Sequence, residues 1–277
     1  MVIQTLDHVL ATGRGIERSF CCPAHGDAHA SASVNVIKGV WVCYACGAHG
    51  QVGEKIIPEL DQILALLSGG APPRVYSESW LDIFDADHES DYWVSRVGSA
   101  VARENRCGTD PVSGHPTYPI RSREEEVWGV VVRYDKAPKY MYPAGVSATA
   151  TLFGRRYSAS VVVLVEGAAD VMALQQSGLP PGWAALGCYG AGLHMPQKQL
   201  VVDCSPRVVI AAFDDDEAGR NAMKRAESQL IDVAPVVSHR WGSIGAKDPG
   251  EAPPEKRIQA LRSTLASTPY ARFARGD

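Results

Sequence analysis

The hydrophobic pattern is most regular between residues 158 and 250, where short apolar runs alternate with stretches of helical periodicity. Continuous runs of β-branched residues predict buried strands, and the segments between them predict helices. The predicted strands are Val161–Val165, Trp183–Leu186, Arg207–Phe213 and Val233–His239. The predicted helices are Ala168–Ser177, Met195–Val202 and Glu217–Leu230. Strands that alternate with helices form a parallel sheet flanked by helices, and sites in such sheets lie at the carboxyl ends of the strands.

The rest of the chain divides into shorter segments. They are residues 1–60, a linker over 61–78, a small mixed α+β region over 79–157 and a tail over 251–277. The linker is predicted because Ser68–Arg74 contains small residues and two adjacent prolines. The mixed region contains a predicted strand at Val127–Arg133. The tail is expected to form a helix over Glu255–Leu265 and then to fray.

Four of the seven cysteines lie between Cys21 and Cys46, beside several histidines. An odd number of cysteines cannot all form disulfides, and such clustering in a reducing compartment indicates metal binding. Two pairs have the two-residue spacing with which zinc ligands hold one edge of a tetrahedron. They are Cys22 with His25 and Cys43 with Cys46, and the residues between the pairs alternate like a β-hairpin over Ser33–Val36 and Val40–Cys43. The sequence therefore predicts a structural Zn²⁺ site.

Other residues of this segment are alternative ligands. Cys21 is one residue too far from His25 for the usual spacing, so Cys22 is preferred. His29 and His49 are expected to face solvent or DNA. The remaining cysteines stand alone in the sequence and are expected to be ordinary core or surface thiols; they are Cys107, Cys188 and Cys204.

Acidic residues follow two of the predicted strands. Glu166 comes directly after the strand Val161–Val165, and Asp170 lies in the first turn of the next helix. Asp214 and Asp216 follow the third strand and share one side of an extended chain. The alternative for such residues is to complement a helix dipole, which is the interpretation we favour for Glu217.

Carboxylates that converge at strand ends repel one another unless a cation lies between them. Hard oxygen ligands suit Mg²⁺ or Mn²⁺, with substrate phosphates completing the coordination. For Glu166, Asp214 and Asp216 together we therefore favour metal binding, with Asp248 as a further acid. Such a site is typical of phosphoryl chemistry.

Composition narrows the class of protein. The 277 residues are 45% hydrophobic and 21% charged, which is ordinary for a globular protein. The net charge of −4 does not favour nucleic-acid binding, so a DNA contact requires a local patch. Between Ile120 and Arg156 there are seven basic residues and four acidic ones. Because there is no long apolar run and no leader peptide, we expect a cytoplasmic protein that does not enter a membrane.

These motifs, in this order, resemble the bacterial and phage DnaG-type DNA primases over about residues 15–250. The cysteine-rich segment is similar to the CHC2-type zinc-binding domain of that family. Three motifs resemble its Toprim domain: Val165–Gly167 with Asp170, Asp214–Arg220 and Lys247–Pro249. Four others resemble the N-terminal subdomain of its RNA polymerase domain: Tyr118–Ile120, Gly129–Arg133, Pro138–Tyr140 and Leu152–Gly154. Several motifs in one order are more specific than any of them alone.

The resemblance implies a fold and a set of functional residues. The fold is a zinc ribbon, then a small mixed α+β subdomain, then an α/β Toprim core. The implied zinc ligands are Cys22, His25, Cys43 and Cys46. The implied catalytic acids are Glu166, Asp170, Asp214, Asp216 and Asp248, of which all but Asp170 would bind magnesium. Arg133 and Lys139 would hold template or nucleotide phosphates. Trp41 and Tyr44 would stack on template bases, although core packing is an equal alternative for Trp41.

The implied activity is synthesis of short RNA primers on single-stranded DNA from ribonucleoside triphosphates, by two-metal nucleotidyl transfer. The chain contains no phosphate-binding loop of the G-x4-G-K-[S/T] type, and little follows Glu251. We therefore expect a short primase, such as a phage encodes, that works with a separate replicative helicase in a bacterial cell or infected host.

The sequence departs from the family pattern at two positions. Asp215 stands where the family usually has glycine, and Gly250 stands where it often has a second acid, with Glu251 one residue later. Two other functions remain open. A Toprim nuclease would use the same acids, although Pro138–Tyr140 argues against it. A recombination-mediator-like protein would join zinc to Toprim without needing the full acidic cluster. A topoisomerase would need a much larger DNA gate.

Overall fold

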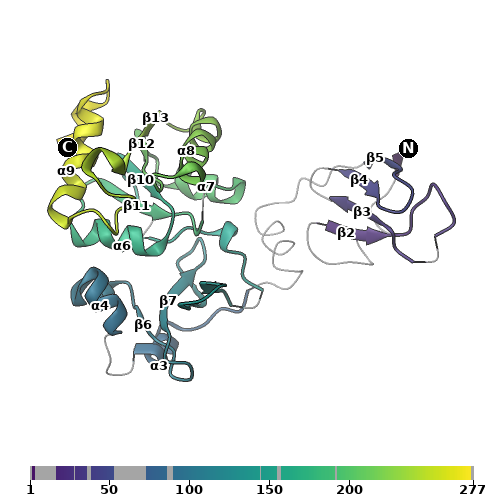
Figure 1. Cartoon of the computed structure of the whole chain (residues 1–277), viewed down its shortest axis with the longest axis horizontal. Coiled ribbons are helices and arrows are strands. Elements are labelled where there is room, and N and C mark those ends of the chain that lie inside the picture. The colour runs from purple at the N-terminus through teal and green to yellow at the C-terminus, as the bar shows by residue number, and fades with distance from the viewer. Residues whose placement is uncertain are drawn as a thin grey trace. The chain divides into compact units, whose positions relative to one another are not determined.

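The structure is a computed structural model, and it describes most of the chain. The described residues are 2–3, 17–27, 29–35, 39–52, 73–85, 90–143, 145–154, 157–190 and 192–275. The chain forms two compact units, which are considered separately here (Figure 1). The first unit contains Met1–Pro73 with Ala144–Ser147, and the second contains Arg74–Pro143 with Ala148–Asp277. Most of the predicted linker, residues 61–72, lies outside the described residues.

The first unit contains a five-stranded sheet. Its strand order is β1 (Val2–Ile3), β5 (His49–Val52), β4 (Val40–Cys43), β3 (Ala32–Asn35) and β2 (Glu17–Phe20). Strands β3 and β4 are antiparallel with Ala32 opposite Cys43, which confirms the predicted hairpin. Its predicted residue Val36 lies outside the described residues. Alternate residues of β4 are buried and exposed, so one side of the sheet packs into a small core around Trp41.

The second unit contains the predicted parallel sheet. Its strand order is β11 (Trp183–Gly187), β10 (Val161–Val165), β12 (Val208–Ala211) and β13 (Val236–Ser238). All neighbouring strands pair in parallel, and every residue of β10 is buried. The prediction of four strands is confirmed, but β13 begins later than predicted. The amides of Val233 and Ala234 bond to the carbonyl of Leu230, because these residues complete the end of the preceding helix.

Helices cover both faces of this sheet. They are α6 (Ala168–Gln176), α7 (Met195–Asp203), α8 (Glu217–Leu230) and α9 (Pro254–Ala266). Helices α7 and α8 pack with Val162 and Leu164 of β10 in one apolar core. Helices α6 and α9 contact each other and lie on the other side of the sheet (Figure 1). No helix among the described residues is long and apolar enough to cross a membrane.

The tail after α9 is packed, and the prediction of a frayed end is wrong for the described residues. A short helix, η4 (Ala271–Arg275), follows α9. The indole nitrogen of Trp183, a fully buried residue of β11, donates to the carbonyl of Phe273 at 3.2 Å. Phe273 is itself buried. An apolar contact and a buried hydrogen bond therefore hold this segment against the sheet.

The mixed α+β region forms an antiparallel sheet with short helices. The strands are β6 (Gly108–Thr109), β7 (Pro116–Arg121), β8 (Val127–Arg133) and β9 (Tyr140–Met141), in that order. The helices are η1 (Glu78–Leu81), α3 (Asp82–Asp85), α4 (Asp91–Val97), α5 (Ser99–Glu104) and η2 (Ala148–Ala150). Tyr76 pairs with Val127, so the last residues of the predicted linker belong to this region.

Phe153 connects this region to the parallel sheet. Its amide and carbonyl exchange hydrogen bonds of 2.9 Å with Gly187 at the end of β11. The next residue, Gly154, has φ of +108°, and a Cβ there would lie 2.3 Å from the carbonyl oxygen of Ala185. Only glycine fits this close approach, which fixes the antiparallel sheet beside the carboxyl end of β11.

Candidate metal centre and acidic active site

The zinc ribbon brings four metal-ligating side chains to one point. The ligand atoms of Cys22, His25, Cys43 and Cys46 all lie within 4.8 Å of one another. Cys43 ends β4, and the turn that follows carries Cys46, with Gly47 at φ of +72° donating to the carbonyl of Cys43. The positive φ explains the glycine in this tight turn. The four residues are those whose spacing predicted zinc ligands.

The donor atoms fit a zinc ion. Nδ1 of His25 is buried and makes no hydrogen bond, as expected of an imidazole nitrogen that binds a metal. Burial raises the pKa of Cys43, but hydrogen bonds from Ser31 and nearby backbone amides outweigh it and lower the pKa to about 6. The thiolate is the form that binds zinc. Asp27 supports the site by accepting from the Cys22 amide at 2.9 Å and from the Ser31 hydroxyl at 2.5 Å.

The alternative ligands do not join this cluster. Cys21 is exposed, and it is not one of the four residues whose ligand atoms lie together in this cluster. His49 is exposed and its Nδ1 lies 3.2 Å from the carbonyl of Gly47. Elsewhere, Cys107, Cys188 and Cys204 are all buried, so they are core thiols.

The two aromatic residues proposed for template stacking have different positions. Trp41 is 3% exposed and meets the ring of Phe20 edge-on at 5.7 Å. The assignment of Trp41 to the DNA-contacting surface is therefore corrected, because its ring is part of the ribbon core. Tyr44 is 78% exposed and remains a candidate.

In the second unit, the sheet places the acids at the ends of two neighbouring strands. Glu166 directly follows β10, and Asp214 lies just beyond β12, which pairs with β10. Asp216 is the N-cap of α8, where its Oδ1 accepts from the amide of Gly219 at 2.9 Å. Asp248 comes from the loop before α9, and its Oδ1 accepts from the Glu251 amide at 2.8 Å. The carboxyl ends of adjacent parallel strands thus bring distant residues together.

Asp170, on α6, is the buried member of this group of acids. Its side chain is buried and its Oδ2 accepts from the amide of Gly167 at 3.0 Å. Burial, together with the charges of Asp248 and Asp214, raises the pKa of Asp170 to about 7. Asp170 is thus both a helix-capping residue and a member of the acidic cluster.

The acids influence one another strongly. Burial is the main cause of a raised pKa at Glu166, and the charges of Asp214 and Asp216 raise it further. Burial likewise raises the pKa of Asp214, with a contribution from Asp248 and an opposing one from Lys247. Mutual repulsion of this kind at a strand-end cluster is what a divalent cation would relieve.

A lysine side chain lies between two of these carboxylates. Nζ of Lys247 is 3.2 Å from Oδ2 of Asp214 and 3.6 Å from Oδ2 of Asp216. Contact with Asp214 is the main cause of a raised pKa at Lys247, so the ammonium is charged at neutral pH. The sequence motif Lys247–Pro249 was recognised, but no role for this side chain was predicted.

The two departures from the family pattern have physical explanations. Asp215 accepts hydrogen bonds from Nε of Arg240 at 2.7 Å and from the Gly242 amide at 2.8 Å. Its carboxylate is thus used in these contacts. Oε2 of Glu251 accepts from the Lys247 amide at 3.1 Å, so this carboxylate serves the loop. A Cβ at Gly250 would lie 2.9 Å from the Arg96 guanidinium, and an acid there would have to displace Arg96.

Close packing fixes the acidic loops. A Cβ at Gly219 would lie 1.9 Å from the carbonyl oxygen of Asp214, so only glycine allows α8 to begin so near β12.

Arg257 of α9 is 3% exposed and binds two separate segments. It donates from Nε to the carbonyl of Ala252 and from Nη1 to the carbonyl of Ala173, both at 2.8 Å. Arg257 therefore ties the Asp248 loop to α6.

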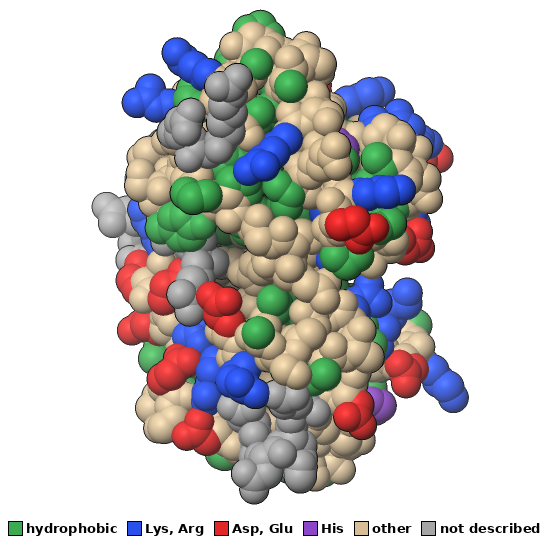
Figure 2. Space-filling view, turned by 90° about the vertical axis from the view of Figure 1, so that its left-hand side faces the viewer, with side chains coloured by type: hydrophobic (Ala, Val, Ile, Leu, Met, Phe, Trp, Pro, Cys, Tyr) green, Lys and Arg blue, Asp and Glu red, His purple; other side chains and the backbone are tan. Residues whose placement is uncertain are grey.

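The predicted phosphate-binding residues lie at the β8–β9 hairpin. Arg133 contacts Asp135 at 3.1 Å, and its guanidinium lies 4.4 Å from the centre of the Tyr92 ring. Lys139 is exposed in the turn between the strands. On the face seen in Figure 2, basic and acidic side chains are interspersed with apolar ones. That face carries no broad basic patch.

Tyrosines beside the acidic cluster were not predicted to be part of a site. Tyr189 has φ of +57°, and the next amide, of Gly190, donates to the Glu166 carbonyl at 3.0 Å. The ring of Tyr189 meets that of Tyr142 edge-on, with 6.0 Å between the ring centres. A non-glycine residue in this backbone region often marks a functional loop, but no sequence pattern reveals it.

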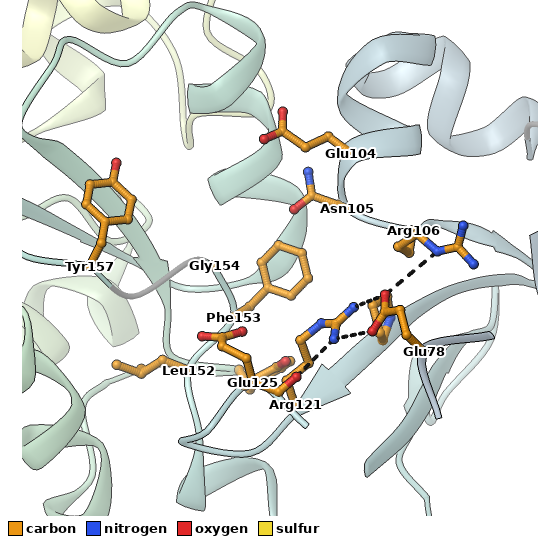
Figure 3. Close-up of a pocket in the computed structure, with 12 residues that line it drawn as sticks. Glu78, Glu104, Asn105, Arg106, Arg121, Glu125, Leu152, Phe153, Gly154 and Tyr157 are labelled. Atoms are coloured by element: carbon orange, nitrogen blue, oxygen red, sulfur yellow. Dashed lines mark hydrogen bonds and ion pairs between the residues drawn. The ribbon is translucent and has the colours of Figure 1, made fainter. Parts of the chain in front are cut away.

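A cavity of about 520 Å³ lies beside this loop, and Tyr189 and Phe153 line part of it (Figure 3). None of the five acids lines it. Arg121 donates to both carboxylate oxygens of Glu78 at 2.8 Å, and Nε of Arg106 lies 3.9 Å from the same carboxylate. The pair with Arg121 joins η1 to β7, the pair with Arg106 joins η1 to the segment after α5, and we assign both a structural role.

Comparisons with known proteins match both units. Residues 3–63 match the family model described as CHC2 zinc finger, and residues 163–252 match that described as Toprim-like. A DNA primase of Helicobacter pylori is 23% identical over 89% of this chain and 56% of its own length. A DNA primase of Streptomyces coelicolor is 32% identical over 46% of this chain and 22% of its own length. Both units of the chain are thus similar to DnaG-type primases.

The resemblance to DnaG-type primases predicted from the sequence is therefore confirmed. The fold is similar to that of the Aquifex aeolicus primase (zinc binding and RNA polymerase domains), with a TM-score of 0.56 and 21% identity over 91% of this chain and 79% of that one. It is also similar to a DnaG primase catalytic domain bound to ssDNA, with a TM-score of 0.51 and 18% identity over 64% of this chain and 70% of that one. The predicted fold class is confirmed. The chain spans about half the length of the curated primases that it matches first.

Proposed function

We propose that the chain synthesises short RNA primers on single-stranded DNA from ribonucleoside triphosphates, as a DNA primase. One observation carries the proposal. Glu166, Asp214, Asp216 and Asp248 converge at the carboxyl end of a Toprim-like sheet, and a zinc ribbon precedes that sheet in the same chain. DNA primases of two bacteria are similar to the chain over most of its length.

The acidic site would carry the chemistry. Glu166, Asp214, Asp216 and Asp248 would hold Mg²⁺ or Mn²⁺, which when bound activate the primer 3′-hydroxyl and stabilise the leaving pyrophosphate, in the two-metal manner. Oδ2 of Asp214 and of Asp216 point at one position, so these carboxylates are already oriented. Asp170 would act indirectly, because its carboxylate holds the Gly167 amide next to Glu166. Arg133 and Lys139 would bind template or nucleotide phosphates.

The zinc ribbon would bind the template. Strand β4 buries Trp41 and Cys43 on one side of the sheet and exposes Val40 and Val42 on the other, and Tyr44, directly after the strand, is also exposed. An exposed aromatic ring among apolar and polar side chains is a sequence-tolerant platform for unstacked bases. We therefore place template selection on this side of the ribbon, with Tyr44 as its stacking residue, and we expect a separate replicative helicase to supply the template.

One experiment separates this function from that of a Toprim nuclease. The protein is incubated with single-stranded DNA of varied sequence, labelled ribonucleotides and Mg²⁺ or Mn²⁺. The template DNA and any labelled RNA are then analysed on a gel. A primase produces short labelled RNA and leaves the DNA intact. Cleaved DNA without RNA would identify a nuclease. If neither RNA nor cleaved DNA appears and the protein still binds the DNA, the recombination-mediator alternative would be favoured. The Asp214→Asn variant is the control for contaminating enzymes.

A further inference from the structure

The ammonium of Lys247 lies where a divalent cation would be expected. Each of Asp214 and Asp216 directs its Oδ2 toward Nζ, at 3.2 Å and 3.6 Å. The other oxygen of Asp216 already accepts from the Gly219 amide, so Oδ2 is the atom it has left for a cation. A metal bound by both oxygens would sit within a few ångströms of Nζ, where two positive charges repel strongly.

The Lys247 backbone is anchored, whereas its side chain can move. The carbonyl of Lys247 accepts from the Asp215 amide at 2.8 Å, and its amide donates to Glu251 at 3.1 Å. The side chain is 49% exposed, compared with 15% for Asp214. A long, half-exposed side chain on a fixed backbone can swing toward solvent without disturbing the loop.

We propose that Lys247 neutralises Asp214 and Asp216 until a divalent ion displaces it, and that the displaced ammonium then binds the triphosphate of the incoming nucleotide. This inference rests on the proposed function, since it assumes that the two acids bind metal. The nucleotide must reach the same acids from the solvent side, which is the side to which Lys247 can swing. Metal binding and nucleotide binding would thus be coupled through one side chain.

The first test measures Mn²⁺ binding to the full chain without nucleotide, by electron paramagnetic resonance of free Mn²⁺. Lys247→Gln should bind Mn²⁺ about tenfold more tightly, the size expected when one nearby charge is removed from a half-exposed site. Lys247→Arg, which keeps the charge, should bind Mn²⁺ like the unmodified protein. Lys224→Gln removes an exposed charge from α8 and should also have no effect.

The second test measures binding of a fluorescent ribonucleoside triphosphate. In saturating Mg²⁺, Lys247→Gln should weaken binding about tenfold, because it lacks the freed ammonium. In EDTA the variant and the unmodified protein should bind equally, since Lys247 is then held by Asp214 and Asp216. A Lys247 that serves only to hold the loop would not produce this dependence on the divalent ion.

The outcomes separate this inference from the proposed function. If Lys247→Gln leaves Mn²⁺ affinity unchanged or weaker, the displacement is wrong. If nucleotide binding weakens equally with Mg²⁺ and with EDTA, or not at all with Mg²⁺, the phosphate contact is wrong. Asp214→Asn tests the site itself: if it binds Mn²⁺ as tightly as the unmodified protein, the proposed metal site fails, whatever Lys247 does.

Discussion

The zinc ribbon and the acidic site both gather metal-ligating side chains, but they are organised differently. The ribbon joins four ligands from residues 22–46 within 4.8 Å, with Nδ1 of His25 buried and without another partner. The acidic site joins carboxylates from two strand ends and a loop, and a lysine lies between two of them. Soft ligands in a closed set suit a permanent structural ion, whereas an open set of carboxylates suits an ion that arrives with substrate. Stability is thus expected to depend on the first site and turnover on the second.

The largest effect should come from the acids themselves. Asp214→Asn and Asp216→Asn should each lower primer synthesis by more than roughly a hundredfold, the usual upper cost of losing a residue that only supports a metal ligand. Both variants should stay folded, because β12 packs through Val209 and Ile210. Gel analysis of labelled RNA and circular dichroism measure the two properties. Retained synthesis in both variants would place the metal elsewhere.

Asp215→Gly is the matched control for those variants. It removes the contacts with Arg240 and Gly242 but no carboxylate facing Lys247. Synthesis should fall by less than about tenfold, since only surface-loop hydrogen bonds are lost. If Asp215→Gly is the most damaging of the three, the orientation of this loop is not the one that acts in catalysis.

Loss of zinc should unfold the ribbon and spare the other unit. Cys43→Ser with Cys46→Ser removes half of the ligand set, and structural zinc contributes on the order of 10 kcal/mol to folding in small metal-dependent domains. The variant should lose its one Zn²⁺ per chain by elemental analysis. Limited proteolysis should then cut within the first 60 residues while Arg74–Asp277 persists. Cleavage of both units at equal rates would show that the ribbon also stabilises the Toprim-like unit.

A smaller effect concerns pH. Because burial raises the pKa of Asp170 to about 7, the folded protein binds this proton more tightly than the unfolded chain. Stability from this group is present below the ordinary aspartate pKa and declines as pH rises toward 7. In EDTA, the melting temperature should fall over this range, and less so in Asp170→Asn. Identical pH profiles of the two proteins would show that Asp170 ionises normally.

The smallest effect should be at Lys139, which is exposed in the β8–β9 turn. Lys139→Ala should weaken binding of single-stranded DNA and reduce the slope of log K against log salt by about 0.7, the value for one phosphate contact on a single strand. Fluorescence anisotropy over a series of salt concentrations measures this slope. An unchanged slope would make Lys139 an ordinary surface lysine.

The same contrast explains what could be predicted from the sequence. The four zinc-cluster residues are close in sequence, so their spacing identified them. The acids are far apart, yet the buried run Val161–Val165 and the run ending at Phe213 predicted parallel strands that deliver them to one edge. The hydrophobic pattern of the chain therefore predicted most of the α/β fold.

The features that were missed depend on long-range contacts. Trp41 and Tyr44 are both aromatic residues near zinc ligands, and only the folded backbone of β4 and of the turn after it puts one ring in the core and the other in solvent. The end of the chain after the predicted helix Glu255–Leu265 was expected to fray, but Trp183 holds it from another part of the chain. Lys247 acquires its position from loop hydrogen bonds that no local pattern encodes.

The contacts of Arg257 have a consequence for engineering smaller enzymes. Its guanidinium, on α9, binds the carbonyls of Ala173 and Ala252, on α6 and beside the Asp248 loop. Helix α9 begins after the last residue that matches the Toprim-like family model, so a designer would be tempted to delete it. Without Arg257, the loop that contains Lys247 and Asp248 would lose its hydrogen-bonded connection to α6. The shortest truncation that preserves the acidic site should therefore still include Pro254–Ala266.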